Sequence, residues 1–358
     1  MRETLGLIIG LTLLFSSCNK KHEDFETLSG KSISKAEIDK YINNQMDSLN
    51  IKGMAFALIN NGKIVYENYY GIKDVNTKEP IDSITTFEAA SIGKSVFTFF
   101  VMKQVEKGLL DLDTPLYQYL PYPDIEQDER YKLITARMVL SHTSGFCNLR
   151  WIEPDLKLNI KFTPGTDFEY SGEGYDYLTK VVAHLNNCNL YNLDSLFQEE
   201  VATPLQLEHF HFQINDYLKS NLASGHNGDS IIFNPWVDKS IFSGSGSLHT
   251  DVHNYAKFLA AILENRELTS ESYKEMFKEN FKFKDENWYT ENLGYTAWSL
   301  GFGMIQSDQG TNYAHIGNNL GYSTGFEINR EKKFGYVYFT NSNQRNELHR
   351  KLEKLLLK

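Results

Sequence analysis

The tetrapeptide Ser91-Ile92-Gly93-Lys94 decides how this chain is interpreted. It stands between the apolar segment 87–90 and the apolar, helix-like run 96–102. A serine that opens a helix has its hydroxyl near the positive end of the backbone dipole, and a lysine one turn later lies on the same face. The lysine amine can then take the serine proton, while backbone N–H groups hold the oxyanion that follows acyl attack. The stretch therefore predicts a serine nucleophile with a lysine base.

The Ser-x-x-Lys spacing is a weak signal when it stands alone. Ser17…Lys20 and Ser32…Lys35 have the same spacing, in segments with no apolar helix behind them. A serine N-cap followed by a solvated lysine accounts for most such pairs. The surrounding segments must therefore decide whether Ser91 has a chemical role.

Six further segments extend the pattern along the chain: 62–67, 108–115, 140–145, 162–165, 170–172 and 315–323. With these segments in this order, the chain resembles the serine β-lactamase and penicillin-binding-protein superfamily. The likeness is to the branch of class C β-lactamases, D-aminopeptidases, DD-carboxypeptidases and related esterases, and it runs from about Ile38 to about Asn343. It implies an α/β domain interrupted by an all-helical domain, with the active site in the crevice between them.

The periodicity of the sequence predicts the same α/β (α+β) class. Asn61-Gly62 joins two strand-like runs and is a strong hairpin signal. Strand-like runs return near the end, so the two ends of the chain are expected to build one antiparallel sheet flanked by helices. The predicted divisions are a lipoprotein-type leader over 1–18, a polar tether over 19–33, an α/β part over 34–110 and 295–358, and a mainly helical insert over 111–294.

The resemblance assigns three catalytic roles. Ser91 matches the nucleophile, Lys94 the lysine one turn later, and Tyr170 the tyrosine that passes a proton to the leaving group. A phenol ionises near pH 10, so it acts as a base at neutral pH only when a close cation stabilises the phenolate. Lys94 is expected to provide that charge.

The segment His315-Ile316-Gly317 matches the superfamily's third motif, on the strand that lines the cleft. Gly317 is expected to let substrate approach the strand backbone closely. The backbone N–H of Asn318 would pair with that of Ser91 as the oxyanion hole. His142 belongs to a helix end and glycine turn that the family shares for structural reasons, so it is left outside the site.

Two residues depart from the pattern of β-lactam-hydrolysing members. Gly172 stands where they usually carry asparagine, and His315 where many carry a lysine that meets the substrate carboxylate. Both changes point to hydrolysis of esters or peptides, with a β-lactamase as an alternative. They also leave open a degenerate enzyme that serves as a binding or sensing module. Tyr175, Trp236 and Trp298 are candidates for the pocket wall or for the core.

Other classes of site are less favoured. His209 and His211 alternate along the chain, but no carboxylate or cysteine with ligand spacing accompanies them, so packing or surface roles are expected. His226 is interpreted as a loop residue. Neither a phosphate loop nor a dinucleotide fingerprint is present in the sequence, so no cofactor is predicted.

The composition is that of a packed globule. The 358 residues are 41% hydrophobic and carry a net charge of −10, so there is no basic surplus for a nucleic-acid partner. The expected partner is a small ester, peptide or lactam substrate, and the oligomeric state is left open.

The N-terminus predicts export. An apolar run over 5–15 ends in Ser16-Ser17-Cys18, which resembles a bacterial lipoprotein processing site. Cys18 would carry lipid and hold the domain at the cell envelope, with the membrane contacted through this anchor only. An ordinary secretory leader cleaved elsewhere is the alternative. Cys147 and Cys188 are interpreted as core thiols.

Overall fold

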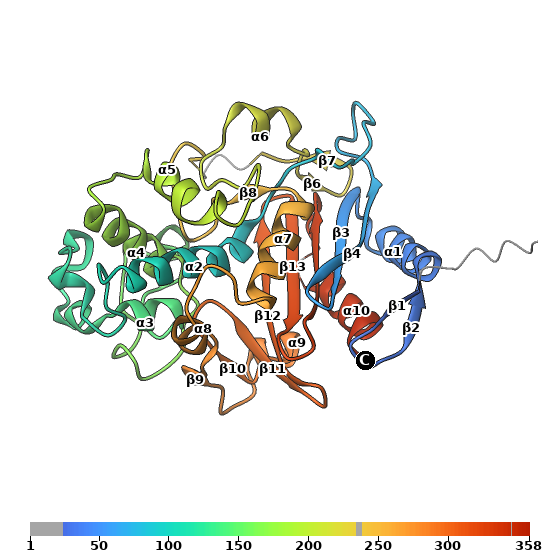
Figure 1. Ribbon diagram of the computed structural model, residues 1–358. Helices are drawn as coiled ribbons and strands as arrows, with labels where there is room; N and C mark the ends of the chain where they lie inside the picture. The colour runs from blue at the N-terminus through green and yellow to red at the C-terminus, as the bar shows by residue number, and fades with distance from the viewer. Residues whose placement is uncertain (1–23, 234–237, 345) are drawn as a thin grey trace, which may run out of the picture.

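An eight-stranded antiparallel sheet organises the chain, with helices on both of its faces and a helical region at one end (Figure 1). The computed structural model describes residues 24–233, 238–344 and 346–358. The architecture confirms the predicted fold class.

The sheet joins the two ends of the chain. Its strand order is β4-β3-β14-β13-β12-β11-β10-β9, and each neighbouring pair is antiparallel. The strands are β3 (Gly53–Asn60), β4 (Lys63–Gly71), β9 (Phe281–Lys282), β10 (Ala297–Trp298), β11 (Gly303–Ser307), β12 (Gly310–Asn319), β13 (Tyr322–Asn329) and β14 (Phe334–Thr340). Because β14 pairs with β3, the C-terminal strands extend directly from the N-terminal hairpin.

The predicted hairpin turn forms at Asn61-Gly62. Both residues have positive φ, 50° for Asn61 and 72° for Gly62, as the tight turn between two twisted antiparallel strands requires. This prediction from two residues is confirmed.

One face of the sheet is covered by the terminal helices, α1 (Lys35–Leu49) and α10 (Glu347–Leu356) (Figure 1). A short hairpin of β1 (Asp24–Glu26) and β2 (Ser32–Ser34) joins the hydrophobic cluster that these two helices form with the sheet, and its Phe25 is buried there. Residues 24–33 of the predicted tether are therefore part of the folded body.

The opposite face is covered by α7 (Val252–Leu263), which contacts β3, β13 and β14. Both α7 and strand β9 lie within 111–294, the segment predicted to be the helical insert. More of that segment therefore belongs to the sheet and its covering layer than the sequence predicted. A strand of two residues is too short to show alternation, and the surface on which a helix packs cannot be recognised from its own sequence.

Most of the remaining helices gather beyond the end of the sheet, around α2, while α6 (Asp216–Asn221) and α9 (Trp288–Leu293) lie outside this group (Figure 1). The group consists of α2 (Gly93–Glu106), α3 (Ala136–Leu140), α4 (Gly172–Leu185), α5 (Leu193–Phe197) and α8 (Ser270–Phe277), and further strands of two residues are β5 (Phe87–Glu88), β6 (His226–Asn227), β7 (Ser230–Ile231) and β8 (His249–Thr250). Helix α2 is buried almost all round, as its apolar sequence predicted. Across the ranges that the structure describes, each helix is too short or too polar for a membrane span.

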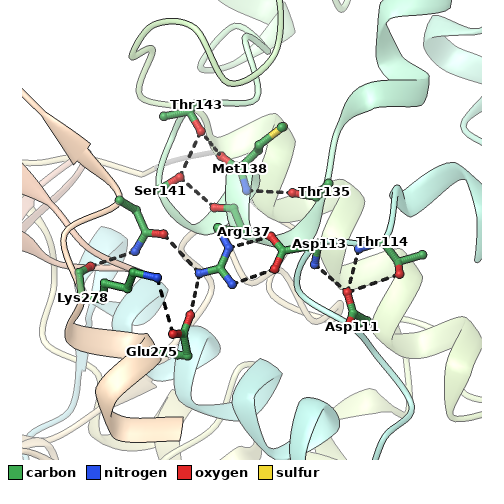
Figure 2. A network of polar contacts seen from close by, with 11 residues as sticks. Asp111, Asp113, Thr114, Thr135, Arg137, Met138, Ser141, Thr143, Glu275 and Lys278 are labelled. Atoms are coloured by element: carbon green, nitrogen blue, oxygen red, sulfur yellow. Dashed lines mark hydrogen bonds and ion pairs between the residues drawn. The ribbon is translucent and has the colours of Figure 1, made fainter. Parts of the chain in front are cut away.

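Arg137 on α3 ties the helical region to α8 (Figure 2). Its guanidinium donates to both carboxylate oxygens of Asp113, at 2.7 and 2.8 Å, and to Glu275 at 2.8 Å. The same helix ends in a turn where the Ser141 hydroxyl donates to the Arg137 carbonyl. The network thus fixes the end of α3, from which the chain continues into the site.

A polar cluster is buried between the sheet and α10. Glu327 on β13 is 1% exposed, and its Oε1 accepts a hydrogen bond of 2.8 Å from Asn312. Its Oε2 lies 3.8 Å from Nε2 of His349, which is also 1% exposed. Burial raises the pKa of Glu327 to about 8 and lowers that of His349 to about 4, so both side chains are neutral near pH 7.

Candidate active site

Ser91 lies in a strained turn at the start of α2. Residues Ala90–Ile92 form a 3₁₀ turn, and α2 begins at Gly93, so Ser91 precedes the α-helix rather than opening it. Ala90 has a φ of +51°, a conformation that non-glycine residues rarely adopt. The turn exposes part of Ser91 while its flanking residues are buried. Such strain at a buried turn persists only where the surrounding structure enforces it.

Lys94 reaches back to Ser91, as the spacing predicted. Its Nζ lies 3.3 Å from the Ser91 Oγ and donates a hydrogen bond to the Ser245 carbonyl. Lys94 is only 2% exposed, and burial lowers its pKa to about 7, against the opposing effect of Asp176. A large fraction of this amine is therefore unprotonated at neutral pH, the state that a general base requires.

Tyr170 stands on the other side of the lysine. The Lys94 Nζ lies 4.9 Å from the centre of the Tyr170 ring. Burial raises the pKa of Tyr170 well above its usual value, and the Ser91 hydroxyl opposes this only in part. The sequence predicted a phenolate stabilised by Lys94, but burial favours the neutral phenol. The neutral phenol carries a proton that it can donate.

His142 packs against the ring of Tyr170. The two rings lie 4.2 Å apart between centroids, and Nδ1 of His142 accepts the backbone N–H of Ser171 at 3.1 Å. The helix end and glycine turn expected at this segment are present, with Gly145 at a φ of +79°. The contact with Tyr170 was missed, because nothing in the sequence indicates that residues 142 and 170 meet.

The third motif lies directly against the nucleophile turn. A Cβ added at Gly317 would stand 2.6 Å from the Ala89 carbonyl oxygen and 2.9 Å from the Ser91 nitrogen. The Thr324 hydroxyl, on the neighbouring strand, donates to the same Ala89 carbonyl at 2.7 Å. Gly317 thus allows strand β12 to approach the turn. Asn318 follows Gly317 on β12 and is exposed.

His315 is buried and neutral. It is 2% exposed, and its ring packs near Tyr170 and Trp298, with centroids 6.0 and 5.5 Å away. Burial and the nearby Lys94 lower its pKa to about 3. Nδ1 lies 2.7 Å from the Ile316 carbonyl, so the ring proton sits on Nδ1 and Nε2 carries a lone pair. His315 therefore adds no positive charge to the cleft at neutral pH.

Asn148, which lies outside the three motifs, fills the space beside Gly172 and accepts its N–H. The Gly172 N–H donates to both the backbone and the side-chain oxygen of Asn148, each at 3.0 Å. A Cβ at Gly172 would come within 3.1 Å of the Asn148 carbonyl oxygen and of a Leu149 methyl group. The segment around Asn148 thus takes the room that a longer side chain at Gly172 would need.

Two of the predicted aromatic residues, Tyr175 and Trp298, belong to the core. Tyr175 is fully buried and donates to the Leu140 carbonyl, while Trp298 is 1% exposed and packs on His142 at 5.0 Å. Trp236 and the lipidation candidate Cys18 lie outside the described residues.

His211, His226, Cys147 and Cys188 lie outside the candidate site. His226, expected in a loop, is buried in strand β6 and accepts the N–H of Val75. His211 contacts Asp194 at 2.7 Å, a partner that the spacing did not reveal. Among the described residues, groups of three or more potential metal ligands are absent. Cys147 and Cys188 are free thiols, as predicted.

Comparison with solved structures places the fold among penicillin-binding proteins and β-lactamases. An octameric penicillin-binding protein homologue from Pyrococcus abyssi matches with a TM-score of 0.77 at 19% identity, covering 91% of this chain and 77% of that one. A class C β-lactamase matches with a TM-score of 0.75 at 18% identity, covering 90% and 95%. At these identities the likeness concerns the fold.

The sequence model of the Beta-lactamase family matches residues 38–358, and this chain belongs to that family. It therefore has the serine hydrolase fold of the β-lactamase and penicillin-binding-protein superfamily, as the motifs predicted. Protein Flp of Staphylococcus aureus is 22% identical over 337 residues, covering 87% of this chain. The chain spans 64% of the length of Flp.

Proposed function

We propose that this protein is a serine hydrolase that forms an acyl-enzyme on Ser91. The observation that carries the proposal is the 3.3 Å contact between the Ser91 Oγ and a Lys94 amine whose pKa is about 7. An unprotonated amine at this distance can accept the hydroxyl proton as Oγ attacks an acyl carbon.

The proposed reaction uses the residues in a fixed order. Lys94 takes the Ser91 proton, Oγ bonds to the acyl carbon, and the backbone N–H groups of Ser91 and Asn318 receive the oxyanion. The leaving group departs with the proton held by the Lys94 ammonium, which reaches it directly or through the Tyr170 hydroxyl, so that Lys94 returns to its free base. In the second half of the reaction Lys94 takes a proton from water, the water oxygen bonds to the acyl carbon, and the Ser91 Oγ leaves with that proton.

The expected substrates are neutral esters and amides, including short peptides. His315 is uncharged at neutral pH, so it cannot pair with a substrate carboxylate as a lysine would. Gly172 supplies only a backbone N–H, and Asn148 already accepts it. We therefore expect weak β-lactamase activity, because an acylamino-lactam presents a carboxylate and an amide side chain that His315 and Gly172 do not bind.

Labelling and turnover test this proposal together. Intact-mass spectrometry after a fluorophosphonate should show one adduct that Ser91→Ala abolishes, with Ser95→Ala as the matched control that keeps it. A panel of nitrocefin, p-nitrophenyl butyrate, a D-Ala-D-Ala peptide and a D-aminoacyl anilide then ranks the substrates. Dominant nitrocefin turnover would make the enzyme a β-lactamase. An adduct that survives Ser91→Ala refutes the nucleophile assignment.

Failure to turn over any substrate would favour a different class of function, the degenerate binding or sensing module. Ester hydrolysis that Lys94→Ala removes would exclude that class, because a binding module does not need the base. Tyr170→Phe gives a second test, since loss of the phenol should slow departure of a basic leaving group more than departure of nitrophenol.

We also propose that Cys18 is lipidated and holds the domain at the bacterial cell envelope. The support is the apolar run over 5–15 followed by Ser16-Ser17-Cys18. Detergent-phase partitioning of the full chain should be lost in Cys18→Ala. Partitioning that persists in that variant, or a mature N-terminus other than Cys18, would contradict the anchor.

A further inference from the structure

A carboxylate lies behind the lysine, outside the three motifs of the site. Asp176 is on α4, one helical turn after Gly172 and therefore on the same side of that helix. Its Oδ1 accepts a hydrogen bond of 2.5 Å from the Ser243 hydroxyl. The Ser243 hydroxyl lies 2.7 Å from that of Ser245, and the Ser245 carbonyl accepts the hydrogen bond from Lys94. Asp176 and the amine thus both bind the segment 243–245, Asp176 through the Ser243 hydroxyl and Lys94 through the Ser245 carbonyl.

Asp176 is a charged group whose field raises the pKa of Lys94. Lys94 is also faced by Tyr170, Tyr175, His142 and His315. Burial keeps both tyrosines protonated and both histidines unprotonated at neutral pH, so these four neighbours are uncharged there. The charge state of the amine is therefore set by burial on one side and by the Asp176 carboxylate on the other.

The hydroxyls of Ser243 and Ser245 favour the ionised form of the Asp176 carboxylate, against its burial. Burial and the nearby charge of Glu173 raise the pKa of Asp176, the hydroxyls of Ser243 and Ser245 and the charge of Lys94 lower it, and the pKa stays above its usual value. Each hydroxyl donates toward the carboxylate or toward the next hydroxyl, which favours the anion. An ammonium formed on Lys94 during acylation would therefore meet a nearby negative charge.

We infer that Asp176, acting through Ser243 and Ser245, is a positioning residue that holds Lys94 and stabilises its ammonium form during acyl transfer. This inference rests on the proposed acyl-enzyme mechanism. It gives the site a polar partner for the lysine in a chain whose Gly172 provides no side chain. The proton moves from Ser91 to Lys94 and on to the leaving group, while Asp176 keeps its charge throughout.

Two pH titrations test the inference. The rate of fluorophosphonate labelling of Ser91 should follow the deprotonation of Lys94, and its midpoint should fall by about one pH unit in Asp176→Asn. The plateau rate at high pH should fall as well, because the amine becomes a weaker base. Asp176→Glu should restore most of both, since it returns the carboxylate. Asp128→Asn, which removes an ion-pairing carboxylate beside Arg130, should leave the profile unchanged.

A second readout does not need acylation. In protein labelled with ¹³C at the lysine ε-carbon, a lysine that titrates near pH 7 is separated from those that titrate near 10, and Lys94→Met assigns it. A lower midpoint in Asp176→Asn, and a smaller shift in Ser243→Ala, would support the inference. An unchanged midpoint in a folded Asp176→Asn protein would overturn it.

The two failures are distinguishable. If wild-type protein takes no label on Ser91, the proposed function fails, but the lysine titration still reports whether Asp176 sets the charge of Lys94. If Asp176→Asn lowers the plateau without moving either midpoint, the residue has only a packing role. Should Asp176→Asn fail to fold, Ser243→Ala carries the same test, because it removes the hydroxyl that binds Asp176 and leaves the helix residue intact.

Discussion

Replacing Glu327 by glutamine should stabilise the protein in a pH-dependent way. The carboxyl group is 1% exposed, and burial raises its pKa to about 8 from a usual value near 4.5. Glutamine keeps an oxygen to accept the 2.8 Å hydrogen bond from Asn312 and carries no charge. The variant therefore removes the cost of a buried ionisable group while preserving its hydrogen bond.

The sign follows from comparing the folded and unfolded chains. Below about pH 4.5 the group is protonated in both states, so its pKa shift costs nothing. As the pH rises to about 8, the unfolded chain gains by ionising while the folded chain does not, and stability is lost across this window. Each pKa unit corresponds to about 1.4 kcal/mol, so the upper limit is about 5 kcal/mol, and relaxation should reduce it to roughly 2–4 kcal/mol.

Reversible urea unfolding at pH 5, 7 and 9 measures this effect. The stability difference between Glu327→Gln and wild type should grow from pH 5 to pH 8 and then level off. The pKa of His349 is lowered to about 4, so this neighbour stays neutral throughout the window. Glu264→Gln is the control, because its ion pair with Lys333 is exposed and contributes less than about 1 kcal/mol. A difference that is constant with pH would refute the reasoning.

Three further outcomes are expected. Labelling of Ser91 should accelerate about fivefold from pH 6 to 7 and about twofold from 7 to 8, because a Lys94 pKa of about 7 sets the fraction of free base; a flat profile measured by mass spectrometry would contradict this. Gly317→Ala should lower acylation roughly 100-fold or more, since its Cβ would collide with the nucleophile turn, while circular dichroism stays that of a folded protein. Arg137→Met should lower the free energy of unfolding by roughly 1–3 kcal/mol in urea, and the exposed control Lys132→Met by less than about 1 kcal/mol.

The parts of the fold that the sequence predicted have local causes. Asn61-Gly62 forms its hairpin because both residues accept positive φ. The two-residue strands β9 and β10 were not predicted, since they are too short to alternate visibly. The packing of α7 on the sheet was missed because the sequence of a helix does not show which surface its apolar face contacts.

In the candidate site, too, the contacts between residues close in sequence were predictable and the contacts made by tertiary packing were not. Ser91 and Lys94 are one helical turn apart, so their 3.3 Å contact follows from spacing. His142 and Asp176 reach the site only through tertiary contacts, across gaps in sequence that no periodicity bridges. The neutral state of Tyr170 could not be foreseen either, because it depends on burial, which a linear sequence does not report.

The pairing of β14 with β3 has a consequence for how the protein is made. Ser91 and Gly317 meet only after the last long strand has closed the sheet, so a ribosome must release most of the polypeptide before any active centre exists. Until then β3 offers an unpaired edge, which invites association with other nascent chains. Contacts between such distant segments also slow folding. Truncation after β13 should therefore yield an aggregating and inert product rather than a weakened enzyme.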